Sequence, residues 1–163
     1  MLRPVIIGVF LFVGLLPAAV SAQGAQVAFG VVQENAGLPV EVTADKLAVD
    51  QQTGEAIFTG NVVIGQGEMR LSADQVLVYY REDPSGVSRL EATGNVILVS
   101  GTDAAESERA DYDVDDGTIV MTGNVLLAQG PSALTADTMT VQLNDGTAQM
   151  SGSVKTVFQT GDQ

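Results

Sequence analysis

The feature that most constrains the fold is a five-residue motif that occurs four times. The copies read Phe-Thr-Gly-Asn-Val, Ala-Thr-Gly-Asn-Val, Met-Thr-Gly-Asn-Val and Met-Ser-Gly-Ser-Val, at residues 58–62, 92–96, 121–125 and 150–154. Their glycines lie 34, 29 and 29 residues apart. A second motif, Ala-Asp before an alternating segment, occurs at 44–45, 73–74, 110–111 and 136–137. Repetition at such a period predicts a stack of similar structural units.

The segments between these motifs predict β-strands. From Pro39 onward apolar and polar residues alternate, as in Val40-Glu41-Val42, and β-branched residues are frequent. Gly-containing turn signals such as Asp116-Gly117 separate these segments. The pattern predicts an all-β domain over residues 39–159, with about sixteen short strands of about five residues each. Residues 23–38 lack a period and are interpreted as an N-terminal tether or edge strand, and residues 160–163 as a C-terminal tail.

The Gly-Asn step predicts a sharp bend within a strand, because both residues tolerate left-handed backbone angles. Alternation then places the residues two before and two after each glycine on one side of the sheet. These pairs are Phe58 and Val62, Ala92 and Val96, Met121 and Val125, and Met150 and Val154. The following residues Val63, Ile97 and Leu126 point the other way but are also apolar. Either both faces are covered, or the bend changes the alternation.

Residues 1–22 have the build of a secretory signal peptide. Arg3 precedes an apolar run from Val5 to Leu16, and Val20-Ser21-Ala22 offers a small-residue cleavage site. We therefore expect cleavage after Ala22 and a periplasmic location, although a retained membrane anchor is the competing interpretation. The chain contains no cysteine, so neither a disulfide nor a lipid-bearing thiol is possible.

The composition argues against nucleic acid as a partner and against most enzymatic chemistry. Twenty acidic residues against seven basic ones give a net charge of −13, whereas binding to nucleic acid requires cationic groups. The absence of histidine and cysteine removes Ser-His-Asp triads, thiol nucleophiles and nearly every zinc site. The acidic cluster Asp111, Asp113, Asp115 and Asp116 departs from a calcium loop at its sixth and twelfth positions, and is interpreted as a solvated face. We expect no catalytic residues, no metal site and no cofactor.

Together, segments 40–45, 57–62, 71–76 and 121–125 resemble the LptA/OstA family of periplasmic lipopolysaccharide-transport proteins. The resemblance extends from about Pro39 to Phe158. It implies a V-shaped, twisted β-jellyroll of about sixteen strands that encloses an apolar groove for the lipid A acyl chains. It also implies a carrier that bridges an LptC-like inner-membrane protein and an LptD-like outer-membrane barrel, and that stacks on itself head to tail through its edge strands.

The resemblance places lipid-facing residues at Val40, Val42 and Tyr112, and a further one near Val99. Val99 has the opposite parity to Val96 and Leu98, which indicates either a bulge or a shift of register. We expect the apolar columns and these positions to form a trough that is open at its ends. The expected lipid contacts are Val40, Val42, Phe58, Val62, Ile64, Leu71, Val76, Val96, Val99, Tyr112, Met121, Val125, Leu127, Met139, Val141 and Met150.

Two other functions fit the same pattern. One is an LptC-like, membrane-anchored partner of the same pathway, which would keep its N-terminal segment. The other is a structural β-solenoid that holds no ligand, which predicts an interior filled by the protein's own side chains.

Overall fold

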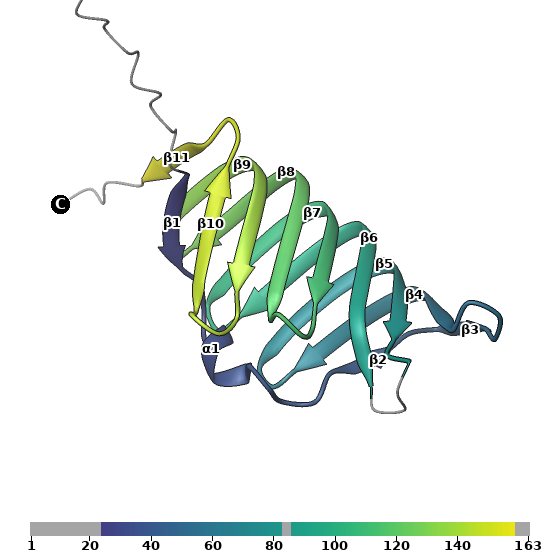
Figure 1. Cartoon of the computed structure of the whole chain (residues 1–163). Coiled ribbons are helices and arrows are strands. Elements are labelled where there is room, and N and C mark those ends of the chain that lie inside the picture. Colours follow the sequence, from purple (N-terminus) through teal and green to yellow (C-terminus); the bar gives the residue numbers. More distant parts are fainter. Residues whose placement is uncertain (1–23, 83–85, 159–163) are drawn as a thin grey trace, which may run out of the picture.

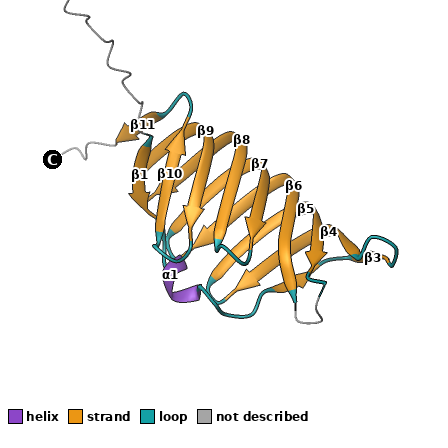
Figure 2. Cartoon of the chain, viewed as in Figure 1, coloured by secondary structure: helices purple, strands orange, loops and turns teal. Residues whose placement is uncertain are grey.

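The computed structural model describes residues 24–82 and 86–158, which form one antiparallel β structure with one short helix in this part of the chain (Figures 1 and 2). The predicted all-β jellyroll class is confirmed. The predicted signal peptide and C-terminal tail lie outside the described residues. The elements are β1 (Ala25–Ala28), α1 (Val32–Asn35), β2 (Glu41–Thr43), β3 (Lys46–Asp50), β4 (Glu55–Gln66), β5 (Met69–Tyr80), β6 (Val87–Ser100), β7 (Asp103–Asp113), β8 (Thr118–Gln129), β9 (Ser132–Gln142), β10 (Thr147–Ser151) and β11 (Lys155–Phe158).

The strands form one open sheet in the order β1-β10-β9-β8-β7-β6-β5-β4-β2. At one end, β4 pairs with β3 before its bend and with β2 after it. At the other end, β9 pairs with β11 before its bend and with β10 after it. The sheet therefore ends in two pairs of edge strands, β2 with β3 and β1 with β11.

The strands are fewer and longer than the sequence predicted. The sheet has eleven strands, and β4 to β9 are 11 to 14 residues long. The prediction of about sixteen short strands was wrong in number, because each long strand continues through its bend with pairing on both sides. Residues 100–108, which are polar, do not interrupt the sheet: residues 103–113 form β7, paired with β6 and β8.

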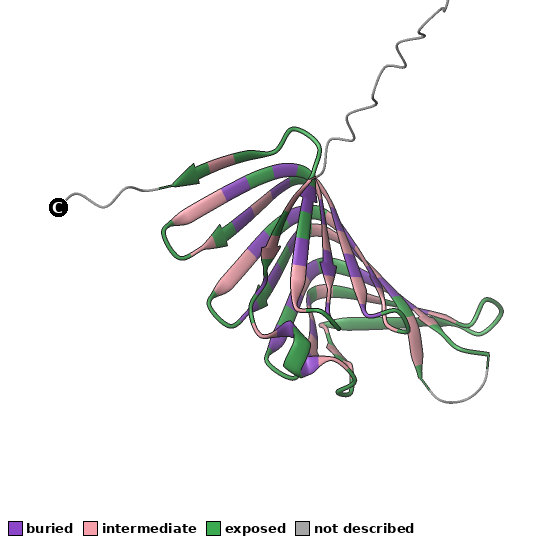
Figure 3. Ribbon diagram, turned by 60° about the vertical axis from the view of Figure 1, so that its left-hand side comes forward, coloured by how far each residue is buried: buried purple, intermediate pink, exposed green. Residues whose placement is uncertain are grey.

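The bends align into a fold line, which we call the crease. At the first three bends the register shifts so that a Gly-Asn pair lies opposite a single residue of the following strand. Gly60 and Asn61, for example, lie opposite Asp74. The backbone is left-handed at both positions, with φ of 83° and 46°. This is a β-bulge, which bends the strand sharply. On either side of the crease the sheet forms two arms that diverge like a V (Figure 3).

An acidic side chain closes each corner. Asp74 accepts a hydrogen bond from the side-chain amide of Asn95 at 2.8 Å, and Asp45 accepts one from Asn61 at the same distance. A Cβ atom at Gly94 would lie 2.5 Å from the Asp74 carboxylate, so no other residue fits there without a shift. The two repeated motifs are therefore the two halves of one corner.

The third corner uses an acid outside the third Ala-Asp pair. The acid that accepts the Asn124 amide, at 2.6 Å, is Glu108 and not Asp111 of the third Ala-Asp pair. Asp111 lies three residues further along β7, where it pairs with Val120. In the fourth corner Ser153 keeps the left-handed conformation, with φ of 50°, in place of asparagine.

The N-terminal segment before β2 is ordered into two elements. Residues 25–28 pair with β10 as an edge strand, and α1 follows. Among the residues described, no helix combines the length and apolar character needed to cross a bilayer.

We predict that Gly94→Ala lowers the free energy of unfolding by about 2–4 kcal/mol, since the left-handed backbone and the clash with Asp74 add together. Gly54 also has a positive φ, of 70°, but nothing lies within 4 Å of an added Cβ atom. Gly54→Ala should therefore cost about 1–2 kcal/mol. Denaturant unfolding measures both values. Equal losses, or a Gly94→Ala loss that Asp74→Ala does not relieve, would contradict the corner mechanism.

Candidate functional site

The interior between the two arms is the candidate site. Buried and more exposed residues alternate along the long strands (Figure 3), and the buried apolar ones form a single core. Twelve of the sixteen predicted lipid-contact residues are buried in it, and Val40, Val42 and Phe58 pack against it partly buried. Their contact with lipid remains a prediction. The buried twelve are Val62, Ile64, Leu71, Val76, Val96, Tyr112, Met121, Val125, Leu127, Met139, Val141 and Met150.

Val99 does not belong to this interior. It is 38% exposed and lies on the outer face, while Val96 and Leu98 are buried. The bulge that would have turned it inward is absent from β6 after Val96, because the pairing there continues without a shift to Ser100. Val154 is also 39% exposed, so the fourth apolar column ends at Met150.

The residues that follow each corner point outward. We call the second arm the side of the crease that contains β2, β11 and, between them, one half of each strand from β4 to β9. Val63, Ile97 and Leu126 lie on the outer face of this arm. The bend therefore preserves the inward position of Val62, Val96 and Val125. The outer face of this arm is partly apolar and open to solvent, with Ile97 exposed.

Inner residues of different size fill the interior together. Beside the crease, Ala92 and Ala110 share the core with larger residues such as Met121, which lies opposite Ala110. Farther from the crease, Leu90 and Ile119 belong to the same core. Combining small and large residues fills the space between the two sheets at the density of a protein interior.

Methionines form a row across the first arm, which contains β3, β10, β1 and the other halves of β4 to β9. Met121 lies opposite Met139, and Met139 lies opposite Met150. All three are fully buried. Methionine is unbranched and flexible, so it adapts to partners of different shape. The row is a deformable wall on one side of the interior.

The interior of the described protein is filled by its own side chains. Most inner residues have no exposed area, which leaves no water-sized space beside them. The expected open trough is thus wrong for the middle of the structure. Apolar side chains reach solvent at the ends: Leu47 and Val49 of β3 are 57% and 61% exposed, and Val157 and Phe158 of β11 are exposed as well.

A polar contact joins the two arms within this apolar interior. The Tyr112 hydroxyl, on the first arm, donates a hydrogen bond of 2.6 Å to Gln66 Oε1 on the second. Burial raises the pKa of Tyr112 to about 12, so the hydroxyl keeps its proton at neutral pH. The Gln66 amide donates in turn to the Leu38 carbonyl at 3.0 Å.

A charged cluster lies on the outer face of the first arm. Arg109 contacts Asp111 at 2.7 Å and Glu91 at 2.9 Å, and Arg89 contacts the same two carboxylates. Arg89 also lies 5.6 Å from the Tyr79 ring centre. Burial alone would raise the pKa of Asp111, but hydrogen bonds from Arg109 and Arg89 outweigh it and lower the pKa. The four acidic residues predicted to be a solvated face thus include two that are paired with arginine, Asp111 and Asp115.

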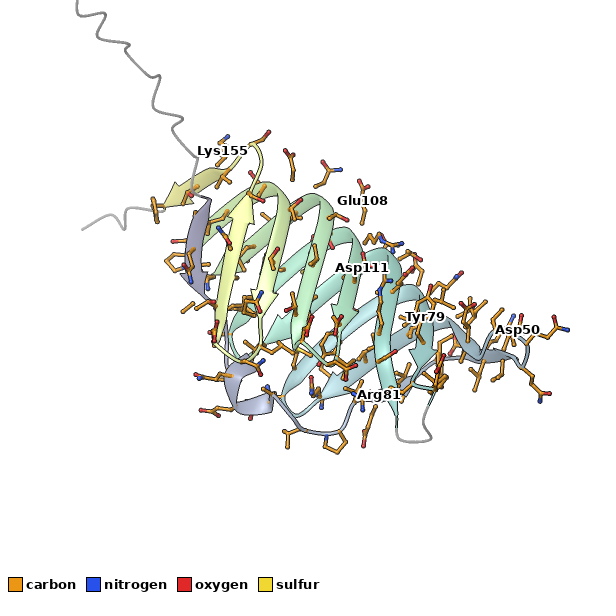
Figure 4. The ribbon with its side chains drawn as sticks, viewed as in Figure 1. Asp50, Tyr79, Arg81, Glu108, Asp111 and Lys155 are labelled. Atoms are coloured by element: carbon orange, nitrogen blue, oxygen red, sulfur yellow. The ribbon has the colours of Figure 1, made fainter. Side chains whose placement is uncertain are left out.

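Other charges lie at the two edges of the fold. Figure 4 shows Glu108 beside the crease and Arg81 near the opposite edge, where Arg81 pairs with Asp115. Across residues 24–82 and 86–158, no group of three or more acidic, histidine or cysteine side chains is arranged to hold a metal ion.

Residues 41–156 match the family model described as "LptA/(LptD N-terminal domain) LPS transport protein". The chain belongs to this family. The match includes the four corners and both arms, and it confirms the resemblance inferred from the repeated motifs.

Several relatives of this LptA/LptD N-terminal domain chain are similar in sequence. An uncharacterised protein of Rhizobium meliloti (strain 1021) is 30% identical over 114 residues, which cover 66% of this chain and 61% of that protein. LPS-assembly protein LptD of Salmonella choleraesuis (strain SC-B67) is 42% identical over 62 residues, 36% of this chain and 8% of LptD. The chain thus spans less than two thirds of the length of these relatives.

A solved structure shares the fold. The crystal structure of LptH, described as the LptA-homologous periplasmic component of the lipopolysaccharide transport device of Pseudomonas aeruginosa, matches with a TM-score of 0.67. The match covers 77% of this chain and 98% of LptH at 15% sequence identity, so it shows the shared architecture.

Some residues of the LptA-like interior were missed by the sequence analysis. Leu90 and Leu98 lie on strands whose alternation could have identified them. Phe29 and Val32 are fully buried in the same core but belong to residues 23–38, which have no sequence period. Their burial results from tertiary contacts, for which the local sequence carries no signal.

We predict that Asp111→Asn lowers the free energy of unfolding at pH 7 by about 0.5–1 kcal/mol, the range for partly exposed ion pairs. Because folding lowers the Asp111 pKa, its contribution is present above the unfolded pKa and is lost as pH falls through the folded pKa. The difference from the wild type should shrink as pH falls below the unfolded pKa, and it should vanish once Asp111 is protonated in the folded state as well. Denaturant unfolding across pH measures it.

Asp145→Asn, at an exposed turn position, is the control for removing one negative charge from a strongly acidic chain. If the two variants lose the same stability at every pH, the arginine cluster has no specific role.

Proposed function

We propose that this protein is a periplasmic, non-enzymatic carrier that holds the acyl chains of lipopolysaccharide between its two arms. The observation that carries the proposal is one apolar core that runs through every long strand, in a chain of an LPS-transport family. The long strands β4 to β9 run through the crease from one arm to the other, and away from it the inner side chains of the two arms share one core. Acyl chains would enter by parting the arms.

The energetics are consistent with this role. About twelve methylenes of one acyl chain leaving water are worth on the order of 10 kcal/mol. The methionine row allows the first arm to repack against chains of different shape, since Met121, Met139 and Met150 adopt many rotamers at low cost. The anionic head group would stay outside, because no lysine or arginine is buried among the residues that the structure describes.

Transfer between copies would use the ends of the sheet. The edge strands β2 and β3 at one end, and β1 and β11 at the other, each have one unpaired side. Exposed Leu47 and Val49 of β3 and Phe158 of β11 lie on the inner face and extend the apolar interior to these ends. Head-to-tail pairing of copies, or pairing with LptC-like and LptD-like partners, would join the interiors into one path.

A second candidate function is a structural β stack without ligand. The filled interior favours it, because such a stack needs side chains in place of lipid. The two candidates differ in one observable. Removing lipid from the purified native protein should change nothing in a structural stack, whereas a carrier should release lipopolysaccharide that mass spectrometry detects.

We predict that Val42→Asp reduces the amount of lipopolysaccharide bound by the purified protein at least tenfold, because a carboxylate in contact with acyl chains loses its hydration. Thr43→Asp is the matched control, since Thr43 is the next residue of β2 and is exposed. Bound lipid is measured by extraction and mass spectrometry, and folding by circular dichroism. Equal binding by two folded variants would contradict the proposed site.

We also predict that Val49→Lys weakens head-to-tail self-association at least tenfold, because lysine on an edge strand opposes pairing with another strand. Ile97→Lys is the control: Ile97 is exposed on the outer face of the second arm and away from the ends. Sedimentation equilibrium measures both. A loss with Ile97→Lys but not with Val49→Lys would place the contact on the outer face.

A further inference from the structure

A segment of ten residues crosses the open side of the V. Residues 29–38, which we call the strap, connect β1 at one end of the sheet to β2 at the other (Figure 1). They pass along the edge where the hairpin turns lie, opposite the crease. We call this edge the mouth.

The strap is bonded to turns of both arms. On the first arm, the Phe29 amide donates to the Gly146 carbonyl at 3.1 Å. On the second, the Gly30 amide donates to Asp103 Oδ2 at 2.9 Å and the Val31 amide to Ser100 Oγ at 3.1 Å. The strap therefore ties the two arms together across the mouth.

The far end of the strap is held by amide side chains. Asn35 is buried, and its Oδ1 accepts a hydrogen bond of 3.0 Å from the Glu68 amide. The Leu38 carbonyl accepts from Gln66, which also bonds to Tyr112. This chain of contacts links the strap to the hydrogen bond that joins the arms.

The inner face of the strap is part of the core. Phe29 and Val32 have no exposed area and belong to the same apolar cluster as the residues of the two arms. Gln33 and Glu34, on the other side of the strap, are exposed. Next to the strap, a cavity of about 170 Å³ is lined by Ala36, Gln66, Tyr112 and Leu143, among others, so packing at the mouth is looser than between the arms.

The strap has little stability of its own. Its helix, α1, is four residues long and lacks a side-chain N-cap. Helices this short do not persist alone in water. The strap is therefore held by its contacts with the arms, and it can detach as a unit without breaking the pairing of β4 to β9.

We propose that the strap is a built-in lid whose Phe29 and Val32 occupy the mouth end of the acyl-chain space, so that lipid loads by displacing it. This inference rests on the proposed carrier function. The strap competes with the lipid for the same apolar surface, which keeps the interior closed in the absence of lipid and limits the rate of loading.

A disulfide across the mouth tests the lid. A Cβ atom at Gly146 would lie 3.3 Å from Cβ of Gln33, close to the separation in disulfides, and the chain has no other cysteine. In the double variant Gln33→Cys, Gly146→Cys, oxidation fixes the strap to the first arm. We expect the oxidised form to take up purified lipopolysaccharide at least tenfold more slowly than the same protein after reduction.

Both single cysteine variants serve as controls, and circular dichroism checks folding in each redox state, because Gly146 has a positive φ of 66°. Asn35→Ala loosens the strap without touching the apolar interior, and we expect it to load several-fold faster than the wild type. Equal uptake by the oxidised and reduced forms, or an unchanged rate in folded Asn35→Ala, overturns the lid. If no form takes up lipid, the carrier function is contradicted, and so is the lid, which rests on that function.

Discussion

The contact between a carboxylate and a left-handed Gly-Asn pair determines the shape of this protein. At each corner the glycine has no Cβ atom, and an acid from earlier in the chain occupies the space where one would be. In the first three corners the asparagine amide also binds that acid, as Asn95 binds Asp74. Since the acid and the amide come from different segments of the chain, their contact fixes the bend of one strand beside the bend of the strand before it. The bends align, and a flat meander becomes two arms with one interior.

The enclosed interior follows from this crease. Two sheets that diverge from a line face each other across a space, and one apolar core of inner side chains from both sheets fills it. The hydrophobic effect holds the arms together, but it does not prescribe which apolar atoms fill the gap. The continuous long strands hold the crease, whereas side-chain contacts and the hydrogen bonds of the strap hold the mouth. The mouth is therefore the part of the interior that opens at the lowest cost.

Much of this architecture could be predicted from the sequence because it depends on local rules. The alternation of apolar residues identified the inner faces of the long strands, and the repeated glycines located the bends. The failures were of two kinds. Glu108 replaces aspartate in the third corner, so a search for Ala-Asp chose Asp111, which instead pairs with arginine. The burial of Phe29 and Val32 depends on arms that lie far away in the sequence, so no local pattern could reveal it.

A filled interior and a lipid carrier are compatible if loading exchanges one set of apolar contacts for another. When an acyl chain replaces Phe29 and Val32 at the mouth, the inner surfaces of the arms remain shielded from water. The acyl chain is transferred from water into the protein. Loading exposes the apolar side chains of the lid and buries the acyl chain. The cost of the first reduces the gain from the second, so the net affinity for lipid is lower than the transfer free energy of the acyl chain alone. A carrier must release its cargo. A lid made of the protein's own apolar side chains provides for that release, because it competes for the site that the lipid vacates.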